Sequence, residues 1–527
     1  MRLILEKACF CFIIFVILMW DLDPSDASAD NSRFIIAHQQ KQQLETMGIT
    51  KPTTVQNSAG PTDYNKTIKN NSNTAQPDNS AELDQENLES LFPSFDIDMP
   101  SDTDMPSRQL AEKSRTAAPM TINGDLRNQT AYRLKKPHQF SKIKTDLNFN
   151  LSGKVSDNVS YVLGTRLSYD AVFDLTDNYN DGVESDQKKQ ADLRDAYVDF
   201  SWGNAEFRIG NQQIVWGQAV GLFFADIVNP NDLREYILPD LDQIRIPVPA
   251  INLEYYPGSL YLQFVFIPYP EFNEFGKQGS EFDFSKLVYE QNADIVMNEA
   301  DELVNSLDNS ELGFRASKLM GGWDLSVFYL YDYYNFPVTY RYISFNPVGS
   351  SHPITLTYQP EYERIHRFGH TFSKEYMDAV FKGEFIYNHE MFISLLNPAD
   401  NDGIVRSDTF KWLLGVDYTF LNSLETNFQL MQEIILDYQA DMTQEEYTTA
   451  LSIWMKKEFF ENTIELELFM VSSLNQRDYL LRPKITYNHN DYLKIICGVD
   501  IFYGESDGDF GLFNKNDRGY IEVLYTF

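Results

Sequence analysis

The chain has 527 residues, of which 77 are acidic and 43 basic, giving a formal net charge of −34. This acidic field and the lack of any basic cluster exclude nucleic acid as a partner. Aromatic residues are abundant, with 38 Phe, 31 Tyr and 6 Trp, yet the mean hydropathy is negative, which argues against an ordinary soluble domain.

Residues 1–29 have the pattern of a signal peptide. Arg2 and Lys7 mark a basic start, residues 8–20 are apolar, and Ala27-Ser28-Ala29 offers a cleavage site of small residues. The alternative, a membrane anchor, needs about 20 apolar residues, and the run is shorter. We therefore expect secretion through the inner membrane and removal of this segment.

Residues 30–119 are rich in Asn, Gln, Ser, Thr, Asp and Pro and show little apolar periodicity. Such a composition cannot bury enough apolar surface to form a core. We expect a disordered periplasmic segment that serves as a tether, with partner docking as the alternative.

The pattern changes at residue 120. The stretch KIKTDLNFNL at 142–151 alternates strictly, with Ile, Thr, Leu and Phe on one face and Lys, Asp and Asn on the other, and the same period recurs over 424–433 and 464–470. A period of two residues predicts strands that have one apolar and one polar face.

Compact turn signals alternate with much longer polar connections. The compact signals include 202–204, 257–259 and 373–375, whereas 268–310 and 335–353 are long. This spacing predicts a sheet whose connections are short on one side and long on the other. Eight compact turns pair sixteen strands, and one strand at each end of the region gives about eighteen, with sixteen as the second possibility.

A soluble sandwich is the alternative to a barrel, but strands of about ten residues suit a tilted span of a bilayer better. In hydrocarbon a sheet must close on itself so that every backbone polar group is paired. The sequence therefore predicts an all-β fold: a transmembrane antiparallel β-barrel over 120–527, with its apolar face toward lipid and its polar face toward water.

The chain ends in GYIEVLYTF, an amphipathic strand with Tyr525 and Phe527 on one face. This ending resembles the assembly signal of bacterial outer-membrane barrels. The resemblance implies location in a bacterial outer membrane, contact with its lipid and lipopolysaccharide, and insertion by the barrel-assembly machinery.

A proline-rich excursion over 216–249 interrupts two expected strands. A barrel of this size is too wide for strand side chains to fill, so we expect this loop to fold inward and narrow the pore. Its charges, with two arginines of the wall, would either create a selective transverse field or pin the loop to the wall. The predicted constriction residues are Arg166, Arg208, Asp232, Arg234, Glu235, Asp240, Asp242 and Arg245.

The same region combines Arg-x-Gly, Gln, Trp-Gly, Asn-Pro-x-Asp and a proline-rich return strand. This combination is similar to a porin-like family of outer-membrane proteins of largely uncharacterised function, whose members often accompany resistance-nodulation-division type exporters. The resemblance implies the barrel fold and an efflux or envelope partner. The residues that carry it are Arg208, Gly210, Gln212, Trp216, Gly217, Asn229, Pro230, Asp232, Pro247 and Pro249.

Catalytic motifs are missing: the sequence has no Gly-x-Ser-x-Gly, no His-Glu-x-x-His and no paired cysteines. Acidic loops at 174–186, 397–403 and 504–511 could ligate calcium, but none keeps a complete calcium-loop spacing, so solvated loops are the favoured interpretation. We expect no enzyme, no cofactor and no metal. Two functions stay open: a passive channel for small solutes, organic or amphipathic ones included, and a barrel-anchored surface or envelope-assembly protein that binds a partner through its loops or N-terminal segment.

Overall fold

A computed structural model of the chain describes residues 120–527 except 220–222, 285–292, 299, 301–302, 348–351, 398–399, 401, 422 and 507. The expected signal peptide (1–29) and the expected disordered segment (30–119) lie outside the described residues. No helix in the described part of the chain is long and apolar enough to cross a membrane.

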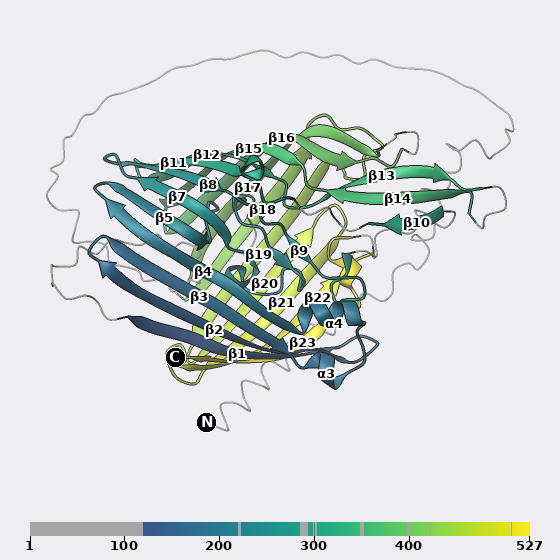
Figure 1. Cartoon of the computed structure of the whole chain (residues 1–527). Coiled ribbons are helices and arrows are strands. Elements are labelled where there is room, and N and C mark those ends of the chain that lie inside the picture. Colours follow the sequence, from purple (N-terminus) through teal and green to yellow (C-terminus); the bar gives the residue numbers. More distant parts are fainter. Residues whose placement is uncertain are drawn as a thin grey trace, which may run out of the picture. The chain divides into compact units, whose positions relative to one another are not determined.

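The described residues form one antiparallel sheet of 18 strands that closes into a barrel (Figure 1). Each barrel strand pairs with the next one along the chain, and the last strand pairs with the first. The prediction of eighteen strands rather than sixteen is confirmed. The barrel strands are β1 Thr121–Arg133, β2 Phe140–Ser156, β3 Val159–Asp170, β4 Lys189–Trp202, β5 Ala205–Gln212, β7 Val248–Tyr255, β8 Leu260–Ile267, β11 Glu311–Met320, β12 Trp323–Tyr333, β15 Arg364–Tyr376, β16 Ala379–Ser394, β17 Ile404–Phe420, β18 Leu424–Ile435, β19 Tyr447–Phe459, β20 Ile464–Ser473, β21 Asp478–Asn488, β22 Leu493–Tyr503 and β23 Arg518–Thr526.

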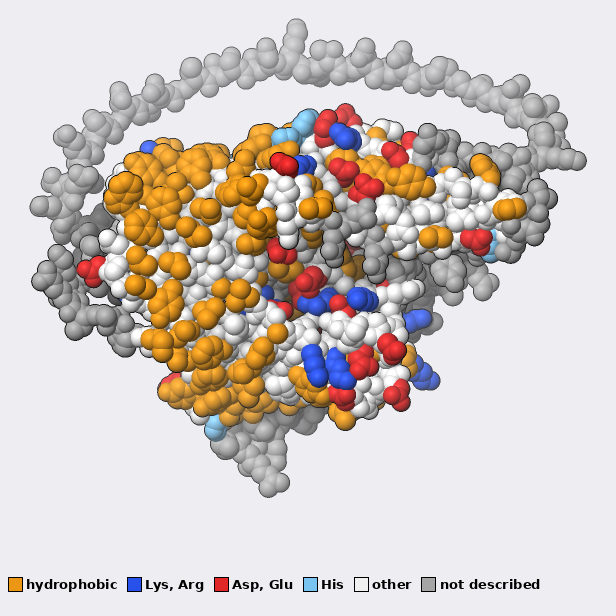
Figure 2. Space-filling model, viewed as in Figure 1, with side chains coloured by type: hydrophobic (Ala, Val, Ile, Leu, Met, Phe, Trp, Pro, Cys, Tyr) orange, Lys and Arg blue, Asp and Glu red, His pale blue; other side chains and the backbone are white. Residues whose placement is uncertain are grey.

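The two faces of the wall follow the sequence alternation. In β2, Leu147 is exposed on the outside, whereas Lys142 and Asp146 are buried on the inside. Figure 2 shows hydrophobic side chains covering the outer face of the strands, while charged side chains gather toward the mouth. An apolar exterior around a polar interior is the arrangement that a membrane-spanning barrel requires.

Eight connections of two to four residues lie at one end of the barrel, as predicted from the turn signals, and one further connection of four residues, 474–477, lies at the other end. One turn was misplaced: residues 373–375 belong to β15, and the chain reverses at Met377 and Asp378 instead. Both residues have a positive φ, of 50° and 61°. Neither is a glycine or a proline, and Asp378 alone is a weaker turn signal than the cluster from Ser373 to Glu375.

The long connections at the other end carry additional structure. Within 335–353, expected to be a loop, lies β13 (Val338–Phe345), which pairs with β14 (Ile354–Glu361). With β10 (Ala293–Met297), these strands form a three-stranded sheet that projects from the barrel (Figure 1). The remaining elements are β6 Asp232–Leu233, β9 Glu274–Phe275, α3 Val172–Leu175, α4 Asp181–Gln187, α5 Leu241–Ile244, η2 Leu307–Asn309 and η3 Gly511–Phe513.

The C-terminal residue lies at the seam of the barrel. Phe527 exchanges two backbone hydrogen bonds with Gly124, of 2.9 and 3.0 Å, beside the β1–β23 ladder. A Cβ at position 124 would lie 2.3 Å from the Asn148 carbonyl oxygen and 2.9 Å from the Phe527 ring, so the close approach requires glycine. The residues of the predicted assembly signal, Tyr525 and Phe527, thus lie at the strand pair that joins the two ends of the sheet.

The assignment of faces makes a testable prediction for β20. Leu466 is exposed on the outer face, and its neighbour Glu467 pairs with Lys484 at 3.0 Å inside the barrel. Leu466→Arg should lower the free energy of unfolding by about 2–4 kcal/mol, because it places a charge against hydrocarbon. Denaturant titration of protein inserted in lipid vesicles measures this loss. Glu467→Gln is the matched control and should insert normally; equal defects in both variants would refute the assignment.

Candidate functional site

The inward loop leaves the sheet after Gln212 and rejoins it at Val248, so it spans 213–247. The predicted bounds of 216–249 are wrong by two to three residues. Pro249 is the second residue of β7 and lies opposite Asn211 in the ladder. Proline has no backbone N–H to donate to the ladder, and it is tolerated near the start of a strand, where that hydrogen bond is not required.

Asn229 joins the two ends of the loop at its base. We call this base the neck. The Asn229 Oδ1 accepts a hydrogen bond from the Ile214 N–H at 2.7 Å, and its Nδ2 donates to the carbonyl of Ile246 at 2.8 Å. The Ile246 N–H in turn donates to the carbonyl of Pro230 at 2.8 Å. One buried amide side chain therefore joins the start of the loop to its end.

Two further residues of the predicted motif shape the strand below the neck. Gln212 is fully buried and donates to the carbonyls of Ala250 at 3.0 Å and Gly210 at 3.2 Å. Gly210 has a φ of 133°, and a Cβ there would lie 2.2 Å from the Ala196 carbonyl oxygen. Only glycine permits this approach, so the Arg-x-Gly spacing has a steric cause.

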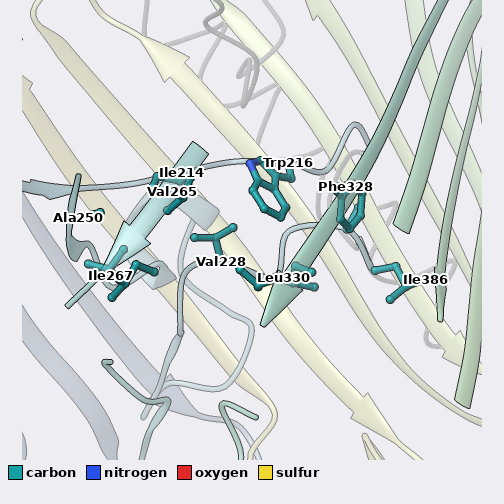
Figure 3. Close-up of a cluster of buried hydrophobic side chains, with 12 residues drawn as sticks. Ile214, Trp216, Val228, Ala250, Val265, Ile267, Phe328, Leu330 and Ile386 are labelled. Atoms are coloured by element: carbon teal, nitrogen blue, oxygen red, sulfur yellow. The ribbon is translucent and has the colours of Figure 1, made fainter. Parts of the chain in front are cut away.

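The first limb of the loop, described over residues 213–219 and 223–228, packs against the wall through a cluster of buried apolar side chains (Figure 3). Trp216 is fully buried, its ring lies 5.2 Å from that of Phe328, and its indole N–H donates to Gln263 Oε1 at 2.8 Å. Burial of each large apolar side chain contributes roughly 1.5–3 kcal/mol. The residues of the cluster are Ile214, Trp216, Ala225, Ile227, Val228, Val248, Ala250, Val265, Ile267, Phe328, Leu330 and Ile386.

Glu384 of β16 anchors this limb to the wall, and the sequence prediction missed it. Its Oε1 accepts from the N–H groups of Gln218 and Ala219 at 2.7 and 2.9 Å. Its Oε2 accepts from those of Phe224 and Ala225 at 2.7 and 2.8 Å. The carboxylate is completely buried, so four backbone donors take the place of water around it. The alternation along β16 places Glu384 inside the barrel, but no sequence signal names its partners.

The tip of the loop reaches the opposite wall. Tyr236 lies among five phenylalanine rings at centroid distances of 5.0–6.3 Å. Arg482 of β21 donates to the carbonyl of Leu238 at 2.6 Å. The rings around Tyr236 come from β22 and from two long connections: Phe282, Phe284, Phe502, Phe510 and Phe513. This aromatic cluster was also missed, because its members are far apart in the sequence.

The return limb, residues 232–247, is held by charge. Glu235 forms ion pairs with Lys142 and Lys144 of β2, the latter at 3.3 Å, and Asp240 pairs with Arg127 of β1 at 3.3 Å. Burial opposes ionisation of Glu235, yet the two ammonium groups outweigh it and hold the pKa of Glu235 below its ordinary value. This carboxylate is therefore charged at neutral pH.

The other predicted constriction residues divide into two groups. Arg166 donates to the Gln243 carbonyl at 3.3 Å, and Asp242 accepts through its carbonyl from Arg194, so these positions join the return limb to β3 and β4. Within the loop, Asp232 pairs with Arg234 at 2.7 Å, and Arg245 pairs with Asp226.

Arg208 differs from these residues in its contacts. Its guanidinium pairs with Asp199 of the neighbouring strand at 2.8 Å and lies 3.9 Å above the Tyr197 ring. The structure thus brings most of the predicted residues together at the loop but gives Arg208 partners in the wall. Its part in a constriction stays a prediction.

Comparison with known proteins gives a family match. The family model described as "Protein of unknown function (DUF1302)" matches residues 53–491. No curated protein matches the chain.

Solved structures of outer-membrane barrels show a distant similarity. One is Acinetobacter baumannii OccAB1, with a TM-score of 0.47 and 9% identity over 77% of this chain and 96% of that one. Another is Pseudomonas aeruginosa OccK8 (OprE), with a TM-score of 0.45 and 10% identity over 77% and 98% of the two chains. Salmonella typhi OmpF in complex with daunomycin has a TM-score of 0.38 and 9% identity over 77% and 97%. Similarities this distant carry no argument about function.

The Glu384 anchor can be tested directly. In Glu384→Gln an NH₂ group replaces one oxygen and faces backbone donors, so two hydrogen bonds are lost. We expect faster hydrogen exchange of the amides over 216–228 and a free energy of unfolding lower by about 1–3 kcal/mol. Glu458→Gln, which removes an inward carboxylate paired with Lys456 at 2.9 Å, should leave exchange over 216–228 unchanged. Unaltered exchange in Glu384→Gln would show that the carboxylate does not hold the limb.

Proposed function

The chain belongs to the DUF1302 family, described as proteins of unknown function, and we propose that it is a porin-like channel through which small solutes diffuse across a bacterial outer membrane. The observation that carries the proposal is the closed 18-stranded barrel with a loop anchored on both sides of its lumen. Eighteen strands enclose more space than their own side chains fill. A barrel that served only as an anchor would have no need of a loop held across that space.

The properties of the lumen support passage of water-soluble molecules. The inside of the wall carries ionised pairs at many depths, such as Lys382 with Asp417 at 2.7 Å and Lys411 with Glu433 at 3.0 Å. The loop adds carboxylates of its own on the return limb. Charged side chains of the wall and of the loop that face each other across a narrow aqueous passage discriminate solutes by charge as well as by size. We propose that organic and amphipathic solutes are included, because the loop also carries aromatic side chains that are only partly buried, Phe223 and Phe224.

A second candidate function is binding of a partner. It is favoured by the sheet of β10, β13 and β14 beyond the barrel, on which Phe345, Tyr342 and Met297 are exposed. Exposed apolar side chains on a projecting sheet suit contact with another protein. An envelope or exporter partner, implied by the family resemblance, belongs to this second proposal.

A deletion within the loop tests the channel function. Asn231 and Arg245 are antiparallel bridge partners, so residues 232–244 can be replaced by two glycines that form a tight turn. The neck and the first limb remain, while Asp232, Glu235 and Asp240 are removed. In planar bilayers the conductance should rise, and selectivity should shift toward anions, because Arg127, Lys142 and Lys144 lose their carboxylate partners.

Native migration on electrophoresis without heating serves as the control for folding of this variant. Absence of conductance in the wild-type protein would overturn the channel function. A deletion variant that folds and conducts like the wild-type protein would show that the return limb lies outside the path of the solute.

A further inference from the structure

Two cavities lie on either side of the return limb, where it faces β1, β2 and β3. Their volumes are about 70 and 40 Å³, and both are lined by Lys142, Lys144, Asp232 and Glu235. The larger cavity extends toward Arg127 and Lys484, and the smaller one toward Tyr179 and Glu281. The contact of Glu235 with the two lysines therefore forms part of the boundary of both cavities.

The wall of the larger cavity is strongly cationic. Its strand residues include only two carboxylates, Asp146 and Glu522. The loop balances three of the wall cations, because Glu235 pairs with Lys142 and Lys144 and Asp240 pairs with Arg127. Carboxylates of the wall pair with the other three, Arg166, Arg482 and Lys484. The strands contribute six cationic side chains: Arg127, Lys142, Lys144, Arg166, Arg482 and Lys484.

The side chains of Glu235, Lys142 and Lys144 form a group that we call the clamp. The carboxylate contacts one ammonium group with each oxygen, Lys142 Nζ at Oε2 and Lys144 Nζ at Oε1. The three side chains are only 10%, 17% and 19% exposed. In such a setting, removal of one partner leaves an uncompensated charge, which is strongly unfavourable.

We propose that the clamp is a binding site for solutes that carry a carboxylate, and that such a solute replaces Glu235 on the two lysines as it moves between the cavities. This inference rests on the proposed channel function and specifies its substrate class. A neutral solute that separated the clamp would take both ammonium groups from Glu235, leaving Lys142 with the Gln129 amide oxygen at 2.7 Å and Lys144 with the more distant Asp146 at 3.8 Å. An anionic solute brings the replacement with it, and a carboxylate reproduces the group that the lysines already hold.

The experiment measures ion permeability of the purified full-length protein in planar bilayers, with gradients of potassium chloride and potassium acetate. Glu235→Gln leaves the lysines without their fixed carboxylate. The permeability of acetate relative to potassium should rise on the order of tenfold, because a cleft lined by charges of one sign enriches counter-ions by at least this factor. Lys142→Met combined with Lys144→Met should lower the same ratio below that of the wild-type protein.

Lys382→Met combined with Asp417→Asn is the control, because it removes an inward ion pair whose lysine lines neither cavity and leaves the net charge of the lumen unchanged. Its acetate permeability should equal that of the wild-type protein. The single variant Lys144→Gln replaces the double variant of Lys142 and Lys144 if the latter fails to fold. The chloride gradient distinguishes preference for a carboxylate from preference for any anion: acetate should gain more than chloride in Glu235→Gln.

The outcomes separate this inference from the channel function. A wild-type protein without conductance refutes both. If the wild-type protein conducts, but Glu235→Gln gives no gain for acetate over chloride or the lysine variants keep the wild-type ratio, the channel function stands and the carboxylate site is refuted. In that case the clamp would only pin the loop.

Discussion

A backbone that leaves its sheet must find partners for its N–H and C=O groups, and the inward loop is shaped by where it finds them. The barrel meets this requirement by closing on itself. The described residues of 213–247 have no neighbouring strand over most of their length, so side chains of the wall and of the loop itself act in place of one. Glu384 accepts four N–H groups of the first limb, Asn229 joins the two ends of the loop, and Arg482 donates to a carbonyl at the tip. The path of the loop follows from the positions of these three residues.

The two limbs are held by different forces. Trp216 and its neighbours exclude water, and such packing is insensitive to salt and to pH. The return limb depends on ion pairs at Glu235 and Asp240, which weaken as salt screens them. One limb is therefore held by packing, whereas the attachment of the other depends on ionic strength.

The sequence was sufficient for features that depend on neighbours along the chain. The alternation in 142–151 identified a strand and its faces, and the spacing of turns gave the number of strands. The motif from Gly210 to Pro230 marked the inward loop, because glycine, asparagine and proline are required by local geometry. The turn at Met377 escaped prediction because its residues lack such a requirement.

Features that depend on distant partners could not be derived in this way. Glu384 lies about 160 residues beyond the amides it binds, and the rings around Tyr236 come from three separate parts of the chain. A period of two shows which side of the wall a residue faces and leaves open what it meets there. Lys142 and Lys144 are a further example. The alternation along the strand predicts that their side chains point into the barrel, but it does not predict that both pair with Glu235.

The neck has a consequence for how such a barrel can diversify. Because Asn229 and the pairing of Asn231 with Arg245 join the loop at its base, the register of β5 against β7 does not depend on the residues between them. Changes of length over 232–244 therefore leave the backbone pairing of β5 with β7 in place. The side chains of this segment stay constrained in one respect, because Arg127, Lys142 and Lys144 of the wall require carboxylates opposite them.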